Sequence, residues 1–526
     1  DRSVSRGLGD VYKRQVGILA VSCLSITALF ACVDKDARSD LNPNLPTDQA
    51  QNGDFGDQGG GSEQGLNFPV FDDGVLAFPG AEGYGKNVTG ARAGEGREIY
   101  HVTNLNDAGP GSFRDAVSKP WRIIVFDVSG VIKLSSNPIV LKSNQTILGH
   151  TAPGDGIVLY NGRVSASGAQ NLIVRYLRIR MGAAYPSELD ACGIANGANM
   201  IFDHCSMTWG KDECFSINPD GKGTAPKNIT IQNSIIGQGL QNHSCGGLMQ
   251  TDISNGCTIF RNLYIDNKTR NPKVKGLNQF VNNVVYNWGS GAAYNMSGDS
   301  QGKSETTIEN NYFIVGPCHN WQNVAQPDGS IKTEYVPMNP ARPFTGGNGN
   351  FNTYCKGNYY DNNKDGALDG VEITETNWSQ YCSGSPVFLE ARSDLHPIIR
   401  SQKSAQEAYE WVVEKVGAYL PVRDEVDKYL MDELISLGRK GTIIQDERKA
   451  EQFPLGGPGT INAAQKPLDS DNDGMPDAFE DAWGLDKYDS TDAVKEAKNG
   501  YLNIENYALS LEYPDEYEYE LNKNKQ

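Results

Sequence analysis

The chain is poor in histidine, in proline and in positive charge. Six histidines occur among 526 residues, and no two cysteines have the C-x-x-C spacing, so a zinc site is not expected. Proline, at 25 residues against 58 glycines, is too rare for a collagen-like or a mostly disordered chain. Downstream of the first thirty-odd residues no apolar run reaches transmembrane length, which argues against a helical channel or transporter.

The charge is negative and unevenly distributed. The 47 lysines and arginines against 65 acidic residues give a formal net charge of -18, which argues against a nucleic-acid partner. Residues 469–526 hold 16 acidic and 5 basic residues and therefore contribute -11 of that charge. The remaining 468 residues sum to only -7, so a basic groove that binds another polyanion is compatible with the body of the chain.

The N-terminal segment has the pattern of an export signal. We exclude residues 1–12, which fit no standard signal, and group residues 1–31 as an extension plus a signal peptide. A basic pair, Lys13-Arg14, precedes an apolar run from Val16 to Ala31 that is short for a bilayer span. The sequence Leu29-Phe-Ala-Cys32 resembles a bacterial lipobox, which implies lipidation of Cys32. The alternative is ordinary signal cleavage nearby.

A polar, glycine-rich stretch follows the signal. Residues 32–68 contain almost no apolar side chains and are predicted to be a lipid anchor and a flexible tether. We therefore expect an exported protein, either a cell-envelope lipoprotein or a secreted one, that touches a membrane only through its anchor. Export permits disulfides, and the eight cysteines beyond Cys32 would allow 105 full pairings.

The body of the chain repeats one short strand motif. Each unit of about 20 to 30 residues contains one or two β-branched, alternating strands that end in Asn, Gly or Asp. So short a unit cannot bury its own apolar face, whereas stacked coils form a continuous core, and asparagine at the corners tolerates left-handed backbone and bonds along the stack. We predict an all-β parallel β-helix over residues 69–450; a β-sandwich would need more hairpin turns than are present. The units are Asn171–Arg180, Asn199–Met207, Asn228–Ile236, Cys257–Ile265, Asn278–Tyr286, Thr307–Ile314 and Tyr354–Tyr360.

Other segments support the solenoid. Helical periodicity returns at Ser404–Val416 and Glu425–Leu437, which we expect to cap the solenoid or lie along it. Arg178 and Arg180 alternate with apolar residues and are predicted to lie on a solvated face. Asp203-His204 is predicted to be a corner pair that stabilises coil stacking.

Charged residues interrupt the strand pattern in three places. These are Glu188-Leu-Asp190, the segment from Asp203-His204 to Trp209–Glu213, and Arg270–Lys275. Because consecutive coils stack at about 4.8 Å, carboxylates far apart in sequence can converge. An oxygen-rich site of this kind suits Ca²⁺, and the basic run one or two coils further would flank it.

Four motifs in order along the chain resemble the extracellular pectate lyases. The resemblance runs from about Phe78 to Gly441. It implies a right-handed parallel β-helix and Ca²⁺-dependent β-elimination of polygalacturonate. The motifs are Phe78-Pro-Gly-Ala-Glu-Gly-Tyr-Gly85, Gly109-Pro-Gly-Ser-Phe-Arg114, Phe202-Asp-His-Cys205, and Arg270-x-Pro-x-Val-Lys275 followed by Asn282-Asn283.

The resemblance assigns the calcium ligands. Asp190 matches the first carboxylate of the family and Asp212 the second. The third expected carboxylate falls at Ser216, which is a departure. Either the adjacent Glu213 takes over, or water fills the position.

The resemblance also assigns the basic residues. Arg270 matches the arginine assigned as the base, and Lys275 matches an arginine that binds the substrate carboxylate. Lys273 is a further candidate for substrate contact. A lysine expected in the coil around residues 243–246 is absent, and His243 is its candidate substitute.

The chemistry implied by the resemblance has a physical basis. The C5 proton of a uronate is weakly acidic, and Ca²⁺ together with a nearby cation stabilises the charge that develops when the proton leaves. The pKa of a guanidinium is above about 12, so Arg270 as base requires nearby cations that lower it, with an alkaline optimum. Alternatively hydroxide is the base and Arg270 only stabilises charge.

The tail contains a second calcium pattern. Residues 469–480 place oxygen ligands at positions 1, 3, 5, 9 and 12 of a loop with glycine at position 6, which is the EF-hand arrangement. We predict that residues 451–526 form a small calcium-binding tail whose ion is structural. The candidate ligands are Asp469, Asp471, Asp473, Asp477 and Glu480.

Three rivals to a pectate lyase remain open at the level of sequence. A lyase acting on methylated pectin would not need the carboxylates at Asp190 and Asp212. A glycan-binding β-helix without activity would explain Ser216 and the absent lysine. A hydrolase would need an acid–base pair of carboxylates. We expect a monomer whose partner is polygalacturonate or pectin.

Overall fold

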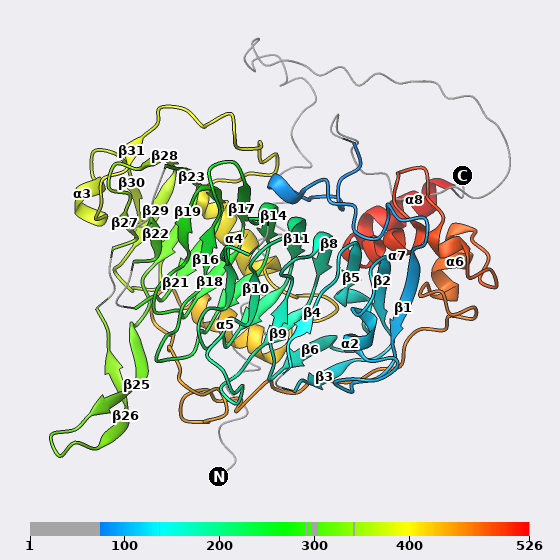
Figure 1. Ribbon diagram of the computed structural model, residues 1–526, viewed down its shortest axis with the longest axis horizontal. Coiled ribbons are helices and arrows are strands. Elements are labelled where there is room, and N and C mark those ends of the chain that lie inside the picture. Colours follow the sequence, from blue (N-terminus) through cyan, green and yellow to red (C-terminus); the bar gives the residue numbers. More distant parts are fainter. Residues whose placement is uncertain are drawn as a thin grey trace, which may run out of the picture. The chain divides into compact units, whose positions relative to one another are not determined.

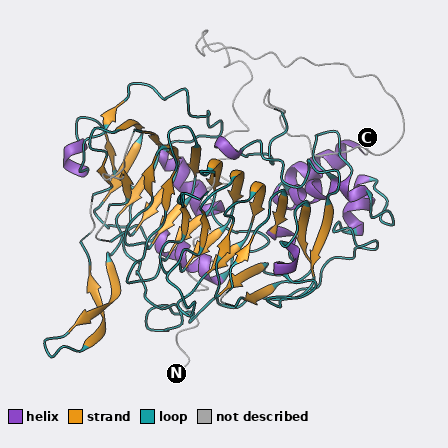
Figure 2. Ribbon diagram, viewed as in Figure 1, coloured by secondary structure: helices purple, strands orange, loops and turns teal. Residues whose placement is uncertain are grey.

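The protein is a parallel β-helix, as predicted. The computed structural model describes residues 74–135, 137–222, 224–289, 292–296, 303–339 and 342–524. In most of the helix each strand pairs in parallel with the strand three positions later in the chain, so one coil contributes one strand to each of three sheets (Figure 1). Figure 2 shows the strands stacked side by side along this coil.

The three sheets, named A, B and C here, contain these strands among the described residues. Sheet A has eleven: β1 (Glu98–Val102), β2 (Arg122–Phe126), β5 (Gln145–Leu148), β8 (Gln170–Arg175), β11 (Ala198–Asp203), β14 (Lys227–Gln232), β17 (Gly256–Phe260), β20 (Leu277–Val281), β23 (Ser304–Glu309), β28 (Phe351–Lys356) and β31 (Val387–Phe388). Sheet B has ten: β3 (Gly130–Lys133), β6 (Ile157–Tyr160), β9 (Arg178–Arg180), β12 (Ser206–Thr208), β15 (Ile235–Gly237), β18 (Leu263–Ile265), β21 (Val284–Tyr286), β24 (Tyr312–Ile314), β29 (Asn358–Asp361) and the antiparallel β30 (Val371–Ile373). Sheet C has eight: β4 (Ile139–Val140), β7 (Val164–Ser165), β10 (Cys192–Ile194), β13 (Phe215–Ile217), β16 (Leu248–Gln250), β19 (Lys273–Lys275), β22 (Tyr294–Met296) and β27 (Phe344–Gly346). A separate antiparallel hairpin consists of β25 (His319–Ala325) and β26 (Ile331–Pro337).

Helices occupy the loops and the C-terminal part. None of those described is both long and apolar enough to cross a membrane. The α-helices are α2 (Phe113–Ala116), α3 (Trp378–Tyr381), α4 (Ala405–Lys415), α5 (Glu425–Ile435), α6 (Asp477–Trp483), α7 (Asn503–Glu512) and α8 (Pro514–Asn524). The short 3₁₀ helices are η1 (Gly83–Gly85), η2 (Gly149–Thr151) and η3 (Asp492–Val494).

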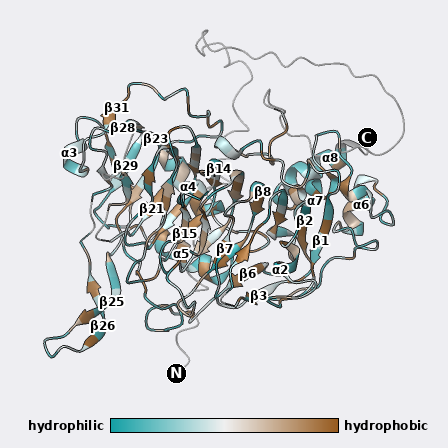
Figure 3. Ribbon diagram, in the orientation of Figure 1, coloured by the Kyte–Doolittle hydropathy of each residue, from teal (hydrophilic) through white to brown (hydrophobic). Residues whose placement is uncertain are grey.

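The interior of the coil is a continuous apolar core. On β11, Met200 and Phe202 point into the core that runs through the coils, whereas Ile201 between them joins a second cluster outside sheet A. This alternation is the two-residue period of a strand. Figure 3 shows hydrophobic segments along the stacked strands.

Asparagines hold the coils in register where sheet A turns into sheet B. The backbone N–H of Asn262 donates to the Asn283 side-chain oxygen at 2.9 Å, and Asn283 donates in the same way to Asn311 at 2.7 Å. The residue before each of these, as at Asn282 (φ 57°) and Asn310 (φ 52°), adopts left-handed backbone, which asparagine tolerates. The predicted role of corner asparagines is confirmed.

Two of the three sheets are covered on their outer faces. The N-terminal segment 76–91 and the tail pack outside sheet A in one hydrophobic cluster, and α4 and α5 pack outside sheet B in another. The outward residues of sheet C include the small or polar Gly193, Ser216 and Gln250 and the apolar Val140 and Leu248. The outer face of sheet C therefore carries polar groups beside some apolar side chains.

The expectation of a solvated face at Arg178 and Arg180 is wrong. Both side chains are buried on sheet B, and an Nη2–Oδ2 distance of 2.7 Å joins Arg180 to Asp424. The start of α5 covers this part of the sheet and supplies carboxylates to the arginines. Strand alternation alone does not reveal a helix that arrives about 240 residues later.

The cysteines of the described chain are packing residues. All eight are buried and none is bridged to another. The permitted disulfide framework is therefore not formed among them.

Candidate active site

The predicted site residues lie at the starts of sheet C strands on consecutive coils. Asp190 precedes β10, Asp212 and Glu213 precede β13, His243 precedes β16, and Arg270 precedes β19. Isolated parallel bridges join Glu213 to Cys245 and Cys245 to Thr269. Coil stacking thus brings together residues separated by about 20 to 30 positions, as the sequence predicted.

Three carboxylates form the centre of the site. Oxygens of Asp190, Asp212 and Glu213 all lie within 4.8 Å of one another. The backbone N–H of Glu213 donates to Asp190 Oδ1 at 3.3 Å, which fixes the two coils relative to each other. Burial, together with the neighbouring Asp190 and Asp212, raises the pKa of Glu213 to about 8. Crowded oxygens that resist ionisation in this way fit a divalent cation, which would neutralise them.

Ser216, the departure from the family pattern, cannot supply a charge. It pairs with Gly193 in the register of β10 and β13, and its hydroxyl accepts a hydrogen bond from the Leu248 N–H at 3.1 Å. Glu213 is instead the third carboxylate in the cluster. Of the two sequence alternatives, the geometry favours Glu213.

Arg270 reaches the carboxylates from the coil that carries β19. Its Nη1 donates to Glu213 Oε1 in a close ion pair. Burial lowers the pKa of Arg270, but Cys245 and Glu213 outweigh that effect and raise it above the ordinary value. This differs from the expectation of a lowered pKa, because the Glu213 carboxylate is in direct contact with the guanidinium.

The remaining basic residues line the same face. His243 Nε2 lies 2.8 Å from Asp212 Oδ1, and this hydrogen bond raises the pKa of His243 to about 10 and lowers that of Asp212. Lys273 and Lys275 are half-exposed on either side of the buried Val274, so they share the outer face of β19. A polyanion lying along sheet C would meet all of these cations.

Two further cations lie at the site and were missed from the sequence. Arg163, just before β7, has Nη2 at 3.9 Å from Asp190 Oδ2. Lys268 Nζ donates to the Asn242 carbonyl at 3.2 Å, so its ammonium lies at the loop where the family lysine was sought. From the sequence, Arg163 could have been found only by counting back one coil from Asp190, and Lys268 only by counting forward one coil from the loop at residues 243–246.

The tail contains a second acidic cluster, separate from the one on sheet C. Oxygens of Asp469, Asp471 and Asp473 lie within 4.8 Å of one another, and so do those of Asp473, Glu480 and Asp492. Asp477 differs from the prediction: its two oxygens accept from the N–H and hydroxyl of Ser470 at 2.7 and 2.8 Å. Asp492, which lies beyond the EF-hand pattern, takes the place next to Glu480.

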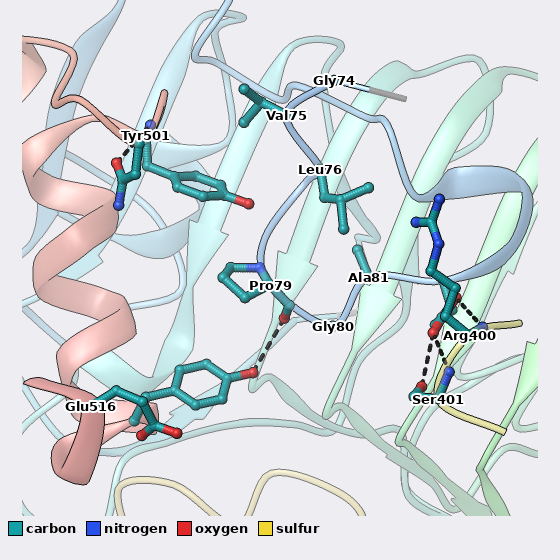
Figure 4. A pocket seen from close by; sticks show the side chains of 13 residues that line it. Gly74, Val75, Leu76, Pro79, Gly80, Ala81, Arg400, Ser401, Tyr501 and Glu516 are labelled. Carbon is teal, nitrogen blue, oxygen red and sulfur yellow. Dashed lines mark hydrogen bonds between the residues drawn. The ribbon is translucent and has the colours of Figure 1, made fainter. Parts of the chain in front are cut away.

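A cavity of about 510 Å³ lies away from these clusters. Figure 4 shows it between the segment Gly74–Glu82, the Arg400-Ser401 loop and tail residues that include Tyr501 and Glu516. The Tyr513 hydroxyl donates to the Pro79 carbonyl at 3.2 Å across it. Its lining contains no residue of a sheet C strand, so it is separate from the site described above.

Cys32 and the rest of the predicted export signal lie outside the described residues.

Comparison with known proteins shows the family of this chain. The family model described as Pectate lyase matches residues 80–352. The chain is 48% identical over 437 residues to the "Probable pectate lyase C" of Aspergillus fumigatus, covering 83% of this chain and 94% of that protein, and 48% identical over the same coverage to that of Aspergillus terreus. Among solved structures, a thermostable pectate lyase, PL 47, aligns with a TM-score of 0.42 and 13% identity over 66% of this chain and 98% of that one. The cedar pollen allergen jun a 1 aligns with a TM-score of 0.41 and 16% identity over 64% and 92%. With sequence identity of this extent to named relatives, this chain belongs to the pectate lyase family.

Proposed function

We propose that the protein cleaves polygalacturonate by β-elimination on the outer face of sheet C. The observation that carries the proposal is the cluster of Asp190, Asp212 and Glu213 oxygens in contact with Arg270. A polyanion needs cations along its path, and Lys273 and Lys275 supply them on the same face. The family and the named relatives support the same activity.

A calcium ion held by Asp190, Asp212 and Glu213 would bind the uronate carboxylate and make its C5 proton more acidic. These ligands are all carboxylate oxygens, which Ca²⁺ prefers. They fit the ion because Glu213 is buried beside two other carboxylates, and a cation would offset the repulsion among the three. The pair Asp190 and Asp212 also speaks against a specialised lyase for methylated pectin, whose substrate has no free carboxylate to bridge.

We propose that Arg270 acts on the C5 proton. In the elimination the base takes the C5 proton, and the electron pair of the C5–H bond forms the C4–C5 double bond. The C4–O bond breaks, and the departing oxygen takes a proton from water. A neutral guanidine can accept a proton, and its fraction grows with pH, so activity rises toward alkaline pH. If hydroxide is the base, activity also rises with pH, but Arg270 is then needed only as a fixed positive charge.

One assay tests the function. The full chain is incubated with polygalacturonate, and the absorbance of the unsaturated product is followed with and without a calcium chelator. We expect absorbance to grow only with Ca²⁺. Reducing ends without absorbance would mean hydrolysis, activity preserved on fully methylated pectin would mean a pectin lyase, and binding without either product would mean a glycan-binding protein.

The site of action follows from the size of the substrate. A polysaccharide does not cross a membrane unaided, so we propose that the enzyme is exported through the segment Val16–Ala31 and anchored by lipid at Cys32. Replacing Cys32 with Ser should then move the protein from the membrane fraction to the medium. We further propose that the enzyme acts as a monomer and that its acidic tail binds Ca²⁺.

A further inference from the structure

We infer that one calcium ion in the tail is held by residues from three separate segments and fastens the tail to the outer face of sheet A. This deepens the proposed calcium-binding tail, and it does not depend on the lyase reaction. The ligands are Asp469, Asp471, Asp473, Glu480 and Asp492.

The three segments have one residue in common between their groups of close oxygens, Asp473. The two groups of mutually close oxygens, 469-471-473 and 473-480-492, share Asp473. The first group lies on a loop, Glu480 lies in α6, and Asp492 begins η3. An ion at Asp473 would therefore bridge a loop, a helix and a later turn.

Buried oxygens without partners point to a ligand at this place. Glu480 is fully buried, yet neither of its carboxylate oxygens has a hydrogen-bond partner among the described residues. The same is true of Oδ2 of Asp473, which is 3% exposed, and of Oδ1 of Asp492, which is 4% exposed. Leaving buried carboxylate oxygens unsatisfied is costly, and a cation would satisfy all of them together.

Hydrogen bonds to Asp469, Asp473 and Asp492 orient the cluster, while both oxygens of Asp471 have no partner among the described residues. Asp469 accepts from the N–H groups of Asp473 and Gly474, each at 3.2 Å. Asp473 Oδ1 accepts from Met475 at 2.8 Å, and Asp492 Oδ2 accepts from Asp486 at 3.0 Å. Asp473 and Asp492 are thus each fixed through one oxygen and keep the other for the ion, whereas Asp469 accepts through both oxygens and would meet the ion with an oxygen that also accepts from its own loop.

Asp477 is a ligand in the predicted EF-hand pattern, but in the structure it holds the loop and is not a ligand of the proposed ion. Both of its oxygens are used by Ser470, which closes the loop onto the start of α6. Asp492 supplies the carboxylate that Asp477 does not. The site is therefore an EF-hand loop completed by a residue from outside the loop.

The ion would hold together the apolar contact between tail and coil. Met475, Phe479 and Trp483, from the loop and from α6, belong to the hydrophobic cluster outside sheet A, together with Ile123 and Val125 of β2. Lys466 adds an ionic link, since its Nζ lies 3.1 Å from Asp127 and 3.4 Å from Asp469. Without the ion, five carboxylates would repel one another within the segment that makes these contacts.

The chemistry of the ligands selects the ion. All five are carboxylates and no histidine or cysteine belongs to the group, which disfavours Zn²⁺. Ca²⁺ accepts about six to eight oxygens in irregular geometry, whereas Mg²⁺ requires a regular octahedron and retains water. We therefore expect Ca²⁺ to bind in preference to Mg²⁺.

The test removes the sheet C cluster first. The background is the full chain carrying Asp190→Asn and Asp212→Asn. One further substitution is introduced into this background, either Asp492→Asn, Glu480→Gln or the matched control Asp477→Asn. Calcium binding to each variant is measured by calorimetry. We expect the Asp492 and Glu480 changes to weaken one binding event by about tenfold or more, and the Asp477 change to leave its affinity within about twofold. Equal weakening by Asp477→Asn and Asp492→Asn would overturn the assignment.

A second measurement tests the fastening and keeps the two proposals separate. Without the sheet C changes, Ca²⁺ should slow proteolysis of the tail and raise the Tm, Mg²⁺ should not, and Asp492→Asn should abolish the effect of Ca²⁺. At saturating Ca²⁺, Asp492→Asn should retain lyase activity. A tail equally protected in wild type and Asp492→Asn would refute the inference, whereas a failure to form unsaturated product would refute only the proposed function.

Discussion

Arg270 and Glu213 form an ion pair that crosses the coil between them, since Arg270 precedes β19 and Glu213 precedes β13. Glu213 is 3% exposed and Arg270 is 28% exposed, so the acid anchors the guanidinium while part of it faces solvent. The pair thus presents one positive group beside three carboxylates. This juxtaposition of opposite charges distinguishes the site from an ordinary polar surface.

Replacing Arg270 with Lys should reduce kcat by about 100-fold or more. An ammonium is a point charge on a flexible chain and cannot keep one group on Glu213 while presenting another toward the substrate. The measurement is the rate of unsaturated product formation at saturating Ca²⁺ and substrate. Lys227→Arg, an exposed change at the start of β14, is the control and should keep wild-type rates. A near-wild-type rate in Arg270→Lys would contradict the role of Arg270 as base and leave it as a fixed charge.

Replacing Glu213 with Gln should weaken Ca²⁺ binding at the sheet C cluster by about tenfold or more. The change removes one of the three charged carboxylates that face the ion, and carboxylate count governs affinity for Ca²⁺. The measurement is the Ca²⁺ concentration that gives half-maximal lyase activity. Asp220→Asn, an exposed acid beyond β13, should leave that concentration unchanged.

A carboxylate introduced at Ser216 should compensate for the loss of the Glu213 carboxylate. Its side chain lies on the outer face of β13 beside Gly193, and a methyl group added at Gly193 would lie 3.2 Å from Asp190 Oδ2. Adding Ser216→Asp to Glu213→Gln should restore part of the lost Ca²⁺ affinity, because it returns a third carboxylate to the cluster. If the double variant binds Ca²⁺ no better than Glu213→Gln, the position does not face the ion.

Periodicity predicted the coil, whereas the resemblance to the pectate lyases assigned the individual residues on sheet C. A strand motif that recurs every 20 to 30 residues or so fixes the stack, and stacking then determines that Asp190, Glu213 and Arg270 meet. Contacts made by the C-terminal segments have no such period. Arg180 meets Asp424 and Glu480 meets Asp492 only because α5 and η3 return to the body of the chain, so local pattern could not identify these partners.

Replacing Arg180 with Met should lower the free energy of unfolding by about 3–5 kcal/mol. Arg180 is fully buried and pairs with Asp424 and Asp427 at 2.7 and 3.0 Å, so its loss leaves the buried Asp427 without this cation and Asp424 with only the 3.6 Å contact to Arg178. Urea denaturation measures the change. Lys440→Met, which breaks the exposed pair with Asp432, should cost less than about 1 kcal/mol. Equal effects of the two variants would mean that the Arg180 pair does not hold α5 to sheet B.

Replacing Glu433 with Gln should make the protein more stable at alkaline pH, where the proposed elimination is fastest. Burial and the neighbouring Asp266 raise the pKa of Glu433, and burial raises the pKa of Asp266 to about 6. Both folded pKa values lie above the ordinary values near 4, so the folded chain holds more protons than the unfolded chain between about pH 4 and the raised values. The free energy of unfolding therefore falls as pH rises through that window, and stability is greatest at its acidic end.

A glutamine at position 433 removes one of these titrations and can still donate to Asp266. We expect the Tm at pH 9 to exceed that of wild type by about 2 °C or more, and the fall in Tm between about pH 5 and pH 9 to become smaller. Thermal unfolding across this range measures both quantities. Asp432→Asn on the same helix removes an exposed charge that makes only a small contribution to the raised pKa of Glu433, so it should change the pH dependence of Tm less than Glu433→Gln does. A Glu433→Gln variant that loses stability in parallel with wild type as pH rises would show that the buried pair does not govern the alkaline limb, and that other acids of the chain do.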